Sequence, residues 1–281
     1  TLFLVDEPGA ILVIGADSSP GNTYVTASGI ESFRNVEVLD LGGGSDTVYV
    51  GFDPQGQHLH EVRGGGGNDF LIDTIVGSVN RNFIGGDGDD TLIGSVSGSD
   101  TLSGGDGRDL IRGGIGLGGD VINGGDGADT LIGGGGFDLL TGGAGNDYID
   151  GGGDSDTISF SADPGPGVTI NLFGGWANSA ATGLDILVDI EGATGSAGND
   201  VIIGRGGSNL LVGLGGNDLI IAGATGDQLF GGAGNDSLVG SAVRDLLQGD
   251  GGIDFVNGGD GVDLIGFRLE TVGIRFFGAQ G

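Results

Sequence analysis

The residues best suited to chemistry in this chain are aspartates that return every nine positions in its second half. The series is Asp200, Asn209, Asp218, Asp227, Asp236, Asp245, Asp254 and Asp263. An aliphatic residue stands two positions after each member, and glycines crowd the positions before it. Carboxylates held at short, regular intervals repel one another strongly unless cations neutralise them. The spacing therefore indicates cation binding rather than a scattered, solvated acidic surface.

The nine-residue unit has the pattern of a glycine-rich turn followed by a very short strand, and GGAGNDSLV at residues 231–239 is the clearest copy. Glycine supplies the positive φ values of a tight turn, and the strand after the aspartate points one aliphatic side chain inward. One unit cannot bury that side chain alone. Stacked units can, with parallel strands about 4.7 Å apart over a continuous aliphatic core.

This G-G-x-G-x-D-x-U-x pattern resembles the RTX family, the hemolysin-type calcium-binding repeats of secreted bacterial proteins. The resemblance implies an all-β fold, a parallel β-roll that is a β-helix-like solenoid, in which two nonapeptides make one coil. It also implies multiple Ca²⁺ ions in the Gly-Asp turns, held between stacked turns by Asp carboxylates and turn carbonyls. Because in-phase copies run through most of the chain, the match is specific.

Carried onto this sequence, the resemblance implies a metal-ligand role for the aspartates of the two repeat blocks and of the repeats before them. We expect these ligands to be Asp46, Asp69, Asp90, Asp109, Asp129, Asp138, Asp147, Asp156, Asp200, Asp218, Asp227, Asp236, Asp245, Asp254 and Asp263. Asp100 and Asp120 follow turns with one and two inserted residues and are the weakest candidates of their block. Glu37 and Glu191 stand nine residues before Asp46 and Asp200, so they are either ligands at the ends of the stack or exposed loop glutamates.

The glycine pattern divides the chain into six segments. We expect an N-terminal β cap at 1–41, the first repeats with an insertion loop at 42–84, a first RTX block at 85–159, a spacer of strands and loops at 160–194, a second RTX block at 195–266, and the start of a further spacer or a C-terminal cap at 267–281. The spacer resembles the uncalcified segments found between RTX blocks. We expect the parent protein to be longer than this chain.

The insertion loop holds both histidines of the chain, His58 and His60, next to Glu61. On one face of a strand these side chains could bind a transition metal. A solvated loop is the simpler interpretation, since no second cluster of ligands can be identified in the sequence.

Composition limits the partners. The formal net charge is −30, and the 9 basic residues are all arginine. Nucleic acid and anionic membrane are therefore poor partners, and no apolar span suitable for membrane insertion is present. Cysteine is absent, so the sequence carries no disulfide information.

The inventory also disfavours catalysis, because lysine and cysteine are missing and no nucleophile elbow, P-loop or zincin motif occurs. We expect no enzyme. The expected function is a structural β-roll module of an extracellular or cell-surface protein of surface-layer, adhesin or matrix type, which folds on binding Ca²⁺. The alternative is a C-terminal secretion and folding module of an exported toxin, protease or lipase.

The outward positions of the second block suggest a further partner. Alternate units place one apolar set on a shared face, namely Val201, Ile203, Leu219, Ile221, Val239 and Phe255. A contiguous apolar patch on a very acidic protein favours lateral self-association or packing within a longer parent chain. The alternative is that these residues are there for strand propensity alone.

Overall fold

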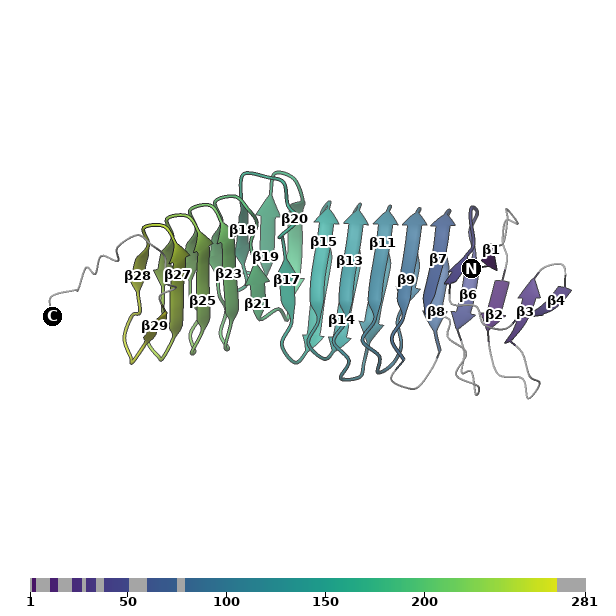
Figure 1. The fold of residues 1–281 in the computed structure, drawn as a ribbon, viewed down its shortest axis with the longest axis horizontal. Coiled ribbons are helices and arrows are strands. Elements are labelled where there is room, and N and C mark those ends of the chain that lie inside the picture. The colour runs from purple at the N-terminus through teal and green to yellow at the C-terminus, as the bar shows by residue number, and fades with distance from the viewer. Residues whose placement is uncertain are drawn as a thin grey trace. The chain divides into compact units, whose positions relative to one another are not determined.

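The computed structural model describes residues 2–3, 11–14, 22–26, 29–33, 38–50, 60–74 and 79–266, with side chains from residue 38 onward. Regular structure in this part of the chain is β-strand throughout, and most strands pair in parallel (Figure 1). Within the same residues there is no helix with the length and apolarity needed to cross a membrane. The expected all-β parallel β-roll is confirmed.

The strands fall into two compact units. Unit 1 comprises Thr1–Ile158 and Thr182–Ile190, and unit 2 comprises Ser159–Ala181 and Glu191–Gly281. The segment 160–194, which the sequence predicts to be a spacer between blocks, is therefore divided between the two units. Residues 267–281 lie outside the described part of the chain.

Unit 1 contains two facing sheets of parallel strands, and the chain alternates between them. In sheet 1 the order is β1 (Leu2–Phe3), β5 (Val38–Asp40), β7 (Glu61–Gly66), β9 (Asn82–Asp87), β11 (Thr101–Asp106), β13 (Val121–Asp126), β15 (Leu139–Ala144) and β17 (Thr157–Ser159). In sheet 2 the order is β2 (Ile11–Ile14), β6 (Thr47–Val50), β8 (Phe70–Asp73), β10 (Thr91–Ile93), β12 (Leu110–Gly114), β14 (Thr130–Gly135), β16 (Tyr148–Gly153) and β20 (Gly183–Val188).

Among the described residues, the N-terminal region expected to cap the stack contributes five strands, and three of them, β1, β2 and β5, belong to the roll itself. Strand β1 pairs in parallel with β5, and β2 pairs in parallel with β6. The other two, β3 (Asn22–Thr26) and β4 (Gly29–Phe33), form an antiparallel pair in a sheet of their own.

Unit 2 repeats the arrangement. Its sheet 1 contains β21 (Gly192–Thr194), β23 (Leu210–Gly215), β25 (Gln228–Ala233), β27 (Leu246–Gly251) and β29 (Leu264–Gly266). Its sheet 2 contains β19 (Trp176–Ser179), β18 (Val168–Asn171), β22 (Val201–Ile203), β24 (Leu219–Ile221), β26 (Ser237–Val239) and β28 (Phe255–Asn257). Strands β18 and β19 form an antiparallel hairpin, and β18 continues in parallel with β22.

A single column of aliphatic side chains from each sheet fills the interior. Ile111, Leu131 and Ile149 are aligned on β12, β14 and β16, and each is 0% exposed. Their neighbours along the strand point outward, because side chains alternate between the two faces of a sheet. Since most strands bury only one large side chain, the column is stable only as a stack.

The turns between the sheets lie along two edges. We call the turns that lead from sheet 1 to sheet 2 row 1, and those that lead from sheet 2 to sheet 1 row 2. A turn of six residues, such as 85–90, which includes the last three residues of β9 and precedes β10, ends in the periodic aspartate. Each row therefore brings together aspartates that are two repeats apart in the sequence.

Candidate metal centres in the turns

The backbone of a turn is set by its second and fourth residues. In the turn that ends at Asp90 these are Gly86 and Gly88, with φ of 119° and 128°. Only glycine adopts such angles without strain. In unit 2 the second position is taken by Leu214 (φ 81°) and Asp250 (φ 66°), so those turns keep the conformation at the expense of backbone strain.

The aspartate that ends each turn is tied to the next rung through one oxygen. The N–H of Asp69 donates to Oδ1 of Asp90 at 2.7 Å, and the N–H of Asp90 donates to Oδ1 of Asp109 at 2.8 Å. Both rows of both units repeat this bond. The row 1 ladders are Asp46, Asp69, Asp90, Asp109, Asp129, Asp147 and Asp185 in unit 1, and Asp200, Asp218, Asp236 and Asp254 in unit 2. The row 2 ladders are Asp100, Asp120, Asp138 and Asp156 in unit 1, and Asn209, Asp227, Asp245 and Asp263 in unit 2.

The second carboxylate oxygen is buried and has no hydrogen-bond partner in most of these residues. This holds for Oδ2 of Asp69, Asp90, Asp109, Asp120, Asp129, Asp138, Asp147, Asp185, Asp218 and Asp236. A buried charged oxygen without a partner is costly, and native proteins rarely leave one unsatisfied. Its repetition at equivalent positions indicates a common ligand chemistry.

The first glycine of the turn shows where these oxygens point. A Cβ built on Gly85 would lie 2.1 Å from Oδ2 of Asp90 and 2.6 Å from the carbonyl oxygen of Gly104 on the next rung. In row 2, a Cβ on Gly133 would lie 2.3 Å from Oδ2 of Asp138 and 2.6 Å from the Gly151 carbonyl oxygen. A carboxylate and a carbonyl from successive turns thus border one small space that only glycine leaves open.

Burial and like charges act together on these carboxylates. Desolvation is the main cause that raises the pKa of Asp90 and Asp129 to about 7, and neighbouring aspartates of the same row raise it further. The backbone N–H bonds oppose this rise because they favour the ionised form. Asp236 follows the same pattern, with its pKa raised to about 6. A nearby cation would favour the ionised form and lower the pKa of these carboxylates.

A family model described as the RTX calcium-binding nonapeptide repeat (4 copies) matches residues 84–117, 95–131, 123–158, 193–220, 221–242 and 239–266, together more than half of the chain. The chain belongs to the RTX repeat family. No curated protein matches it. Family membership implies Ca²⁺ binding by these RTX turns, and the donor set fits, since Ca²⁺ prefers carboxylate and carbonyl oxygens.

Side chains alone do not complete an RTX site in this protein. Among the described residues, no group of three or more His, Cys, Asp or Glu side chains could hold a metal ion by itself. The carbonyls beside each Oδ2, such as that of Gly104, are therefore needed as further ligands. When bound, Ca²⁺ would supply the positive charge that the buried RTX carboxylates lack.

In a minority of the RTX turns, a backbone N–H of the same turn donates a hydrogen bond to the second carboxylate oxygen of the aspartate. Oδ2 of Asp100 accepts the N–H of Ser95 at 2.6 Å, and Oδ2 of Asp200 accepts that of Ser196 at 2.6 Å. In row 2 of unit 2, Oδ2 of Asp227 accepts the N–H of Gly223 at 2.7 Å, and Oδ2 of Asp245 accepts a turn N–H in the same way. We call these turns closed and the others open. Of the two weak candidates from the sequence, Asp100 has a closed turn whereas Oδ2 of Asp120 has no partner.

The remaining expected ligands occupy the ends of the ladders. Asp46 and Asp156 are buried, whereas Asp254 and Asp263 are half-buried. Glu191 lies in register with Asn209, but its carboxylate pairs with Arg205 at 3.3 Å. Glu37 lies outside the described residues, and its role stays a prediction.

Two positions depart from the RTX pattern in other ways. In row 2 of unit 1, Arg81 takes the place of an aspartate: its N–H donates to Oδ1 of Asp100 at 2.6 Å, and its Nε donates to Oδ2 of Asp73 at 2.6 Å. In the insertion loop, His58 lies outside the described residues and His60 is exposed. Glu61, the first residue of β7, accepts hydrogen bonds from Arg63 and Asn82, and the transition-metal site stays an untested prediction because residues 51–59 lie outside the described part of the chain.

Asp185 is a ladder residue that the periodicity missed. It is 0% exposed, its Oδ1 accepts the N–H of Asp147 at 3.0 Å, and its Oδ2 has no partner. It lies within the presumed spacer and outside the residues that the family model matches. The signal was the short pattern Gly-x-Asp-x-Leu from Gly183 to Leu187, in which Gly183 has φ of 91° and Leu187 is buried.

Proposed function

We propose that this chain is a structural β-roll module of an extracellular or cell-surface protein, of surface-layer, adhesin or matrix type, which folds when Ca²⁺ binds its open turns. The observation that carries the proposal is the unbroken sequence of buried aspartates along row 1 of unit 1, from Asp69 to Asp147, each with an unpartnered Oδ2. Successive rungs place like charges side by side, which opposes folding unless cations intervene.

Because folding is coupled to Ca²⁺ binding, the module should fold outside the cell and not in the cytosol. Extracellular calcium modules have dissociation constants of roughly 10⁻⁴ to 10⁻³ M, which cytosolic calcium does not reach and the external medium does. In low calcium the net charge of −30 keeps the chain expanded. Outside the cell, binding free energy becomes folding free energy. RTX proteins are typically secreted, in agreement with this role.

The proposal assigns no catalysis to the module. A structural role needs no reactive side chain, and the feature that recurs in the turns is a buried carboxylate oxygen without a partner. A secretion and folding module of an exported toxin, protease or lipase would use the same calcium-dependent folding. Fusing the chain to an unrelated passenger in a secreting host distinguishes the two, because only a secretion module carries the passenger out.

A calcium titration of the full chain tests the proposal directly. Circular dichroism in a chelator should show loss of the strand signal, and millimolar Ca²⁺ should restore it, whereas equal Mg²⁺ should not, because Mg²⁺ loses its water shell reluctantly. A chain that keeps its full strand signal in the chelator, or that binds no Ca²⁺ at millimolar concentration, contradicts the proposal.

Lateral association is a further part of the proposal. Leu219, Ile221 and Val239 lie on the outward face of sheet 2 in unit 2 and are half-buried, and Phe255 is 57% exposed. We expect this face to contact a second copy of the chain. Replacing Ile221 and Val239 by Thr should weaken association in sedimentation, and the matched change of Ile93 and Ile132 in unit 1 should not. A Ca²⁺-loaded protein that stays monomeric at high concentration contradicts self-association.

A further inference from the structure

The two rows of unit 2 differ in the hydrogen-bond partners of their turn-ending side chains. In row 1, Oδ2 of Asp218 and Oδ2 of Asp236 are buried without a partner. In row 2, three successive rungs are closed. The N–H of Arg205 donates to Oδ1 of Asn209 at 2.8 Å, and Asp227 and Asp245 accept equivalent turn N–H groups on Oδ2.

Backbone conformation at the second turn position explains the difference. Along row 1 this position holds Leu214, Gly232 and Asp250, with φ of 81°, 108° and 66°. In the row 2 turns that end at Asn209, Asp227 and Asp245 it holds Arg205, Gly223 and Ser241, which do not adopt positive φ, whereas the last row 2 turn has Gly259 with φ of 88°. In the row 2 turns the second N–H faces the carboxylate of its own turn, and the oxygen that an open turn would offer to a metal is already bonded.

The atoms that border the space above the first glycine also differ between the row 1 turns and the row 2 turn that ends at Asn209. In row 1, a Cβ on Gly213 would lie 2.1 Å from Oδ2 of Asp218 and 2.5 Å from the carbonyl oxygen of Gly231, so two acceptors border the space. In the row 2 turn that ends at Asn209, a Cβ on Gly204 would lie 2.6 Å from Oδ1 of Asn209 and 2.8 Å from the backbone nitrogen of Gly223. A nitrogen that donates a hydrogen bond repels a cation where the carbonyl attracts one. Above Gly240 two acceptors remain, but Oδ2 of Asp245 already accepts the N–H of Ser241.

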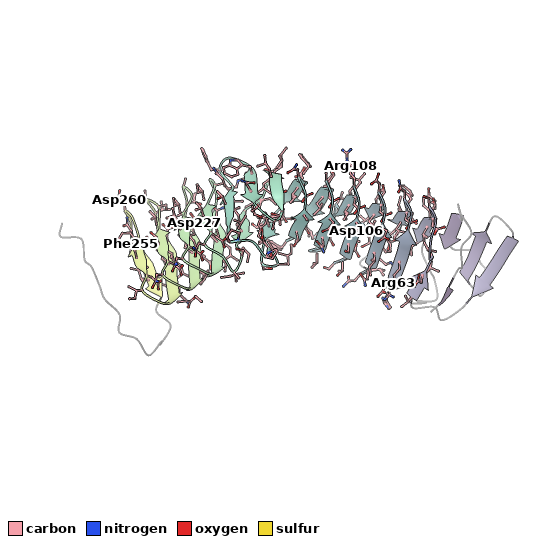
Figure 2. All side chains as sticks on the ribbon, turned by 90° about the horizontal axis from the view of Figure 1, so that it is seen from above. Arg63, Asp106, Arg108, Asp227, Phe255 and Asp260 are labelled. Carbon is pink, nitrogen blue, oxygen red and sulfur yellow. The ribbon has the colours of Figure 1, made fainter. Side chains whose placement is uncertain are left out.

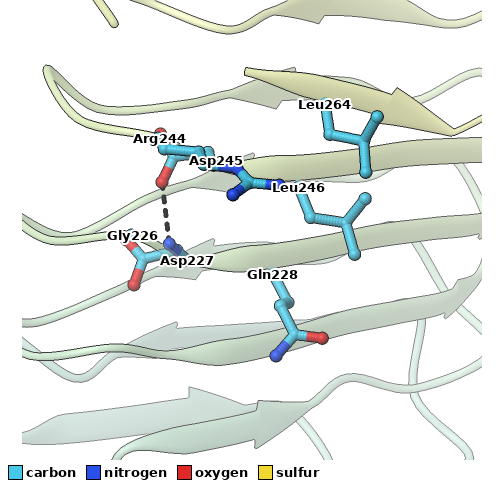
Figure 3. A pocket seen from close by; sticks show the side chains of 7 residues that line it. All are labelled: Gly226, Asp227, Gln228, Arg244, Asp245, Leu246 and Leu264. Carbon is cyan, nitrogen blue, oxygen red and sulfur yellow. Dashed lines mark hydrogen bonds between the residues drawn. The ribbon is translucent and has the colours of Figure 1, made fainter. Parts of the chain in front are cut away.

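The negative charge of row 2 in unit 2 is also reduced by the protein itself, without a bound metal. Asn209 replaces one aspartate by a neutral amide, whose Nδ2 donates to the carbonyl of Glu191 at 2.9 Å. The guanidinium of Arg205 pairs with the Glu191 carboxylate at 3.3 Å. Figure 3 shows the next rungs of this row, where the N–H of Asp227 donates to Oδ1 of Asp245 at 2.7 Å beside Arg244.

We propose that Ca²⁺ loads unit 2 at its open turns, such as those ending at Asp218 and Asp236 in row 1, and that the row 2 turns ending at Asn209, Asp227 and Asp245 are closed by their own backbone and bind no metal. Unit 1 differs, since both of its rows contain open carboxylates, for example Asp129 in row 1 and Asp138 in row 2. This proposal rests on Ca²⁺ binding as the proposed function, and it assigns the ions to particular turns.

A matched pair of variants in the full chain tests it. Asp227→Asn and Asp236→Asn each remove one negative charge from a buried ladder residue of unit 2, and each keeps an oxygen for the ladder bond. Asn209 shows that row 2 accommodates an amide. Bound calcium is counted by equilibrium dialysis at saturating Ca²⁺, and unfolding is followed over a calcium series.

The expected result is that Asp236→Asn loses at least one bound ion, while Asp227→Asn keeps the full number and shows at most a calcium-independent drop in melting temperature. Asp218→Asn serves as a second row 1 variant should Asp236→Asn fail to fold. Equal loss in both rows, or loss only in Asp227→Asn, overturns the proposal, and so does no loss in any variant. A parent chain that binds no Ca²⁺ at all overturns the proposed function instead.

Discussion

The backbone N–H of Asp218 donates a 2.8 Å hydrogen bond to Oδ1 of Asp236, while Oδ2 of Asp236 is buried with no partner. One carboxylate therefore has two tasks on its two oxygens: Oδ1 joins neighbouring rungs, and Oδ2 is left for a cation. The first task needs only a hydrogen-bond acceptor, whereas the second needs negative charge. Substitutions that separate acceptor from charge can therefore separate stacking from metal binding.

The pH dependence follows from the raised pKa values. Asp90, Asp120 and Asp218 have a pKa of about 7 in the folded chain without metal, mainly through desolvation, against an unfolded value of about 3.9. The folded state thus binds more protons than the unfolded state, so the metal-free fold is most stable below about pH 4 and loses that stability as pH rises towards 7. Ca²⁺ needs the ionised form, so protons compete with it.

We expect the half-saturating Ca²⁺ concentration to rise as pH is lowered from 8 through 6 to 5. In chelator, part of the strand signal should return towards pH 5, measured by circular dichroism at low protein concentration because the sequence pI is near 4.1. A half-saturation point that stays constant over this range would show that the carboxylates are not desolvated as described.

A second prediction concerns the first glycine of an open turn. Gly85→Ala places a methyl group 2.1 Å from Oδ2 of Asp90 and 2.6 Å from the Gly104 carbonyl, so two ligand oxygens must move apart. We expect lower Ca²⁺ affinity and a lower melting temperature. Gly66→Ala is the control, since its added Cβ meets nothing within 4 Å, and it should be tolerated. Similar effects of the two changes would contradict a ligand role for the space above Gly85.

A third prediction concerns Asp185. Asp185→Asn removes charge from the last rung of row 1 in unit 1, next to Asp147, and we expect fewer bound Ca²⁺ ions and earlier melting of that unit. Asp189→Asn removes the same charge from an exposed residue four positions later and should leave bound calcium unchanged. Calcium counts by equilibrium dialysis decide between them, and unchanged binding in Asp185→Asn would remove this residue from the ladder's metal sites.

The fourth prediction separates Arg81 from the calcium-dependent turns. The Arg81 and Asp73 side chains are 6% and 0% exposed, and Nε lies 2.6 Å from Oδ2. Arg81→Met leaves a buried carboxylate without this partner and should cost about 3–5 kcal/mol of stability even at saturating Ca²⁺. The double change Arg81→Met with Asp73→Leu should recover much of that loss. Chemical denaturation in excess Ca²⁺ measures both, and full rescue of the single variant by Ca²⁺ alone would contradict the prediction.

The nine-residue period was sufficient to predict the fold, because it sets both the parallel stack and the inward aliphatic column that Leu131 and Ile149 represent. It was insufficient to tell open turns from closed ones. That distinction depends on the φ of one residue, and Leu214 takes a positive φ where Ser241 does not. Sequence alone favours neither outcome for these residues. Asp185 was missed because its turn keeps only one glycine of the pattern.

Charged residues of the repeat differ in their exposure. Asp106 and Arg108 lie on one turn and are both exposed, whereas Asp227 is buried although it belongs to the same repeat pattern (Figure 2). Whether a charge faces solvent or the turn interior depends on its position in the six-residue turn. The periodicity shows that position only where no residue is inserted or lost.

The division of the chain between the units has a consequence for how unit 1 is completed. After β17 the chain forms the β18–β19 hairpin of unit 2, and only then supplies β20, whose Asp185 and Leu187 complete unit 1 beside Asp147 and Ile149. A chain that ends at Ile158 therefore lacks the last rung of a unit that otherwise looks finished in sequence. Unit 1 can be completed only when residues that follow the first strands of unit 2 are present. Recombination between the two blocks within residues 159–181 would separate β20 from the unit it completes, so the blocks are not interchangeable cassettes.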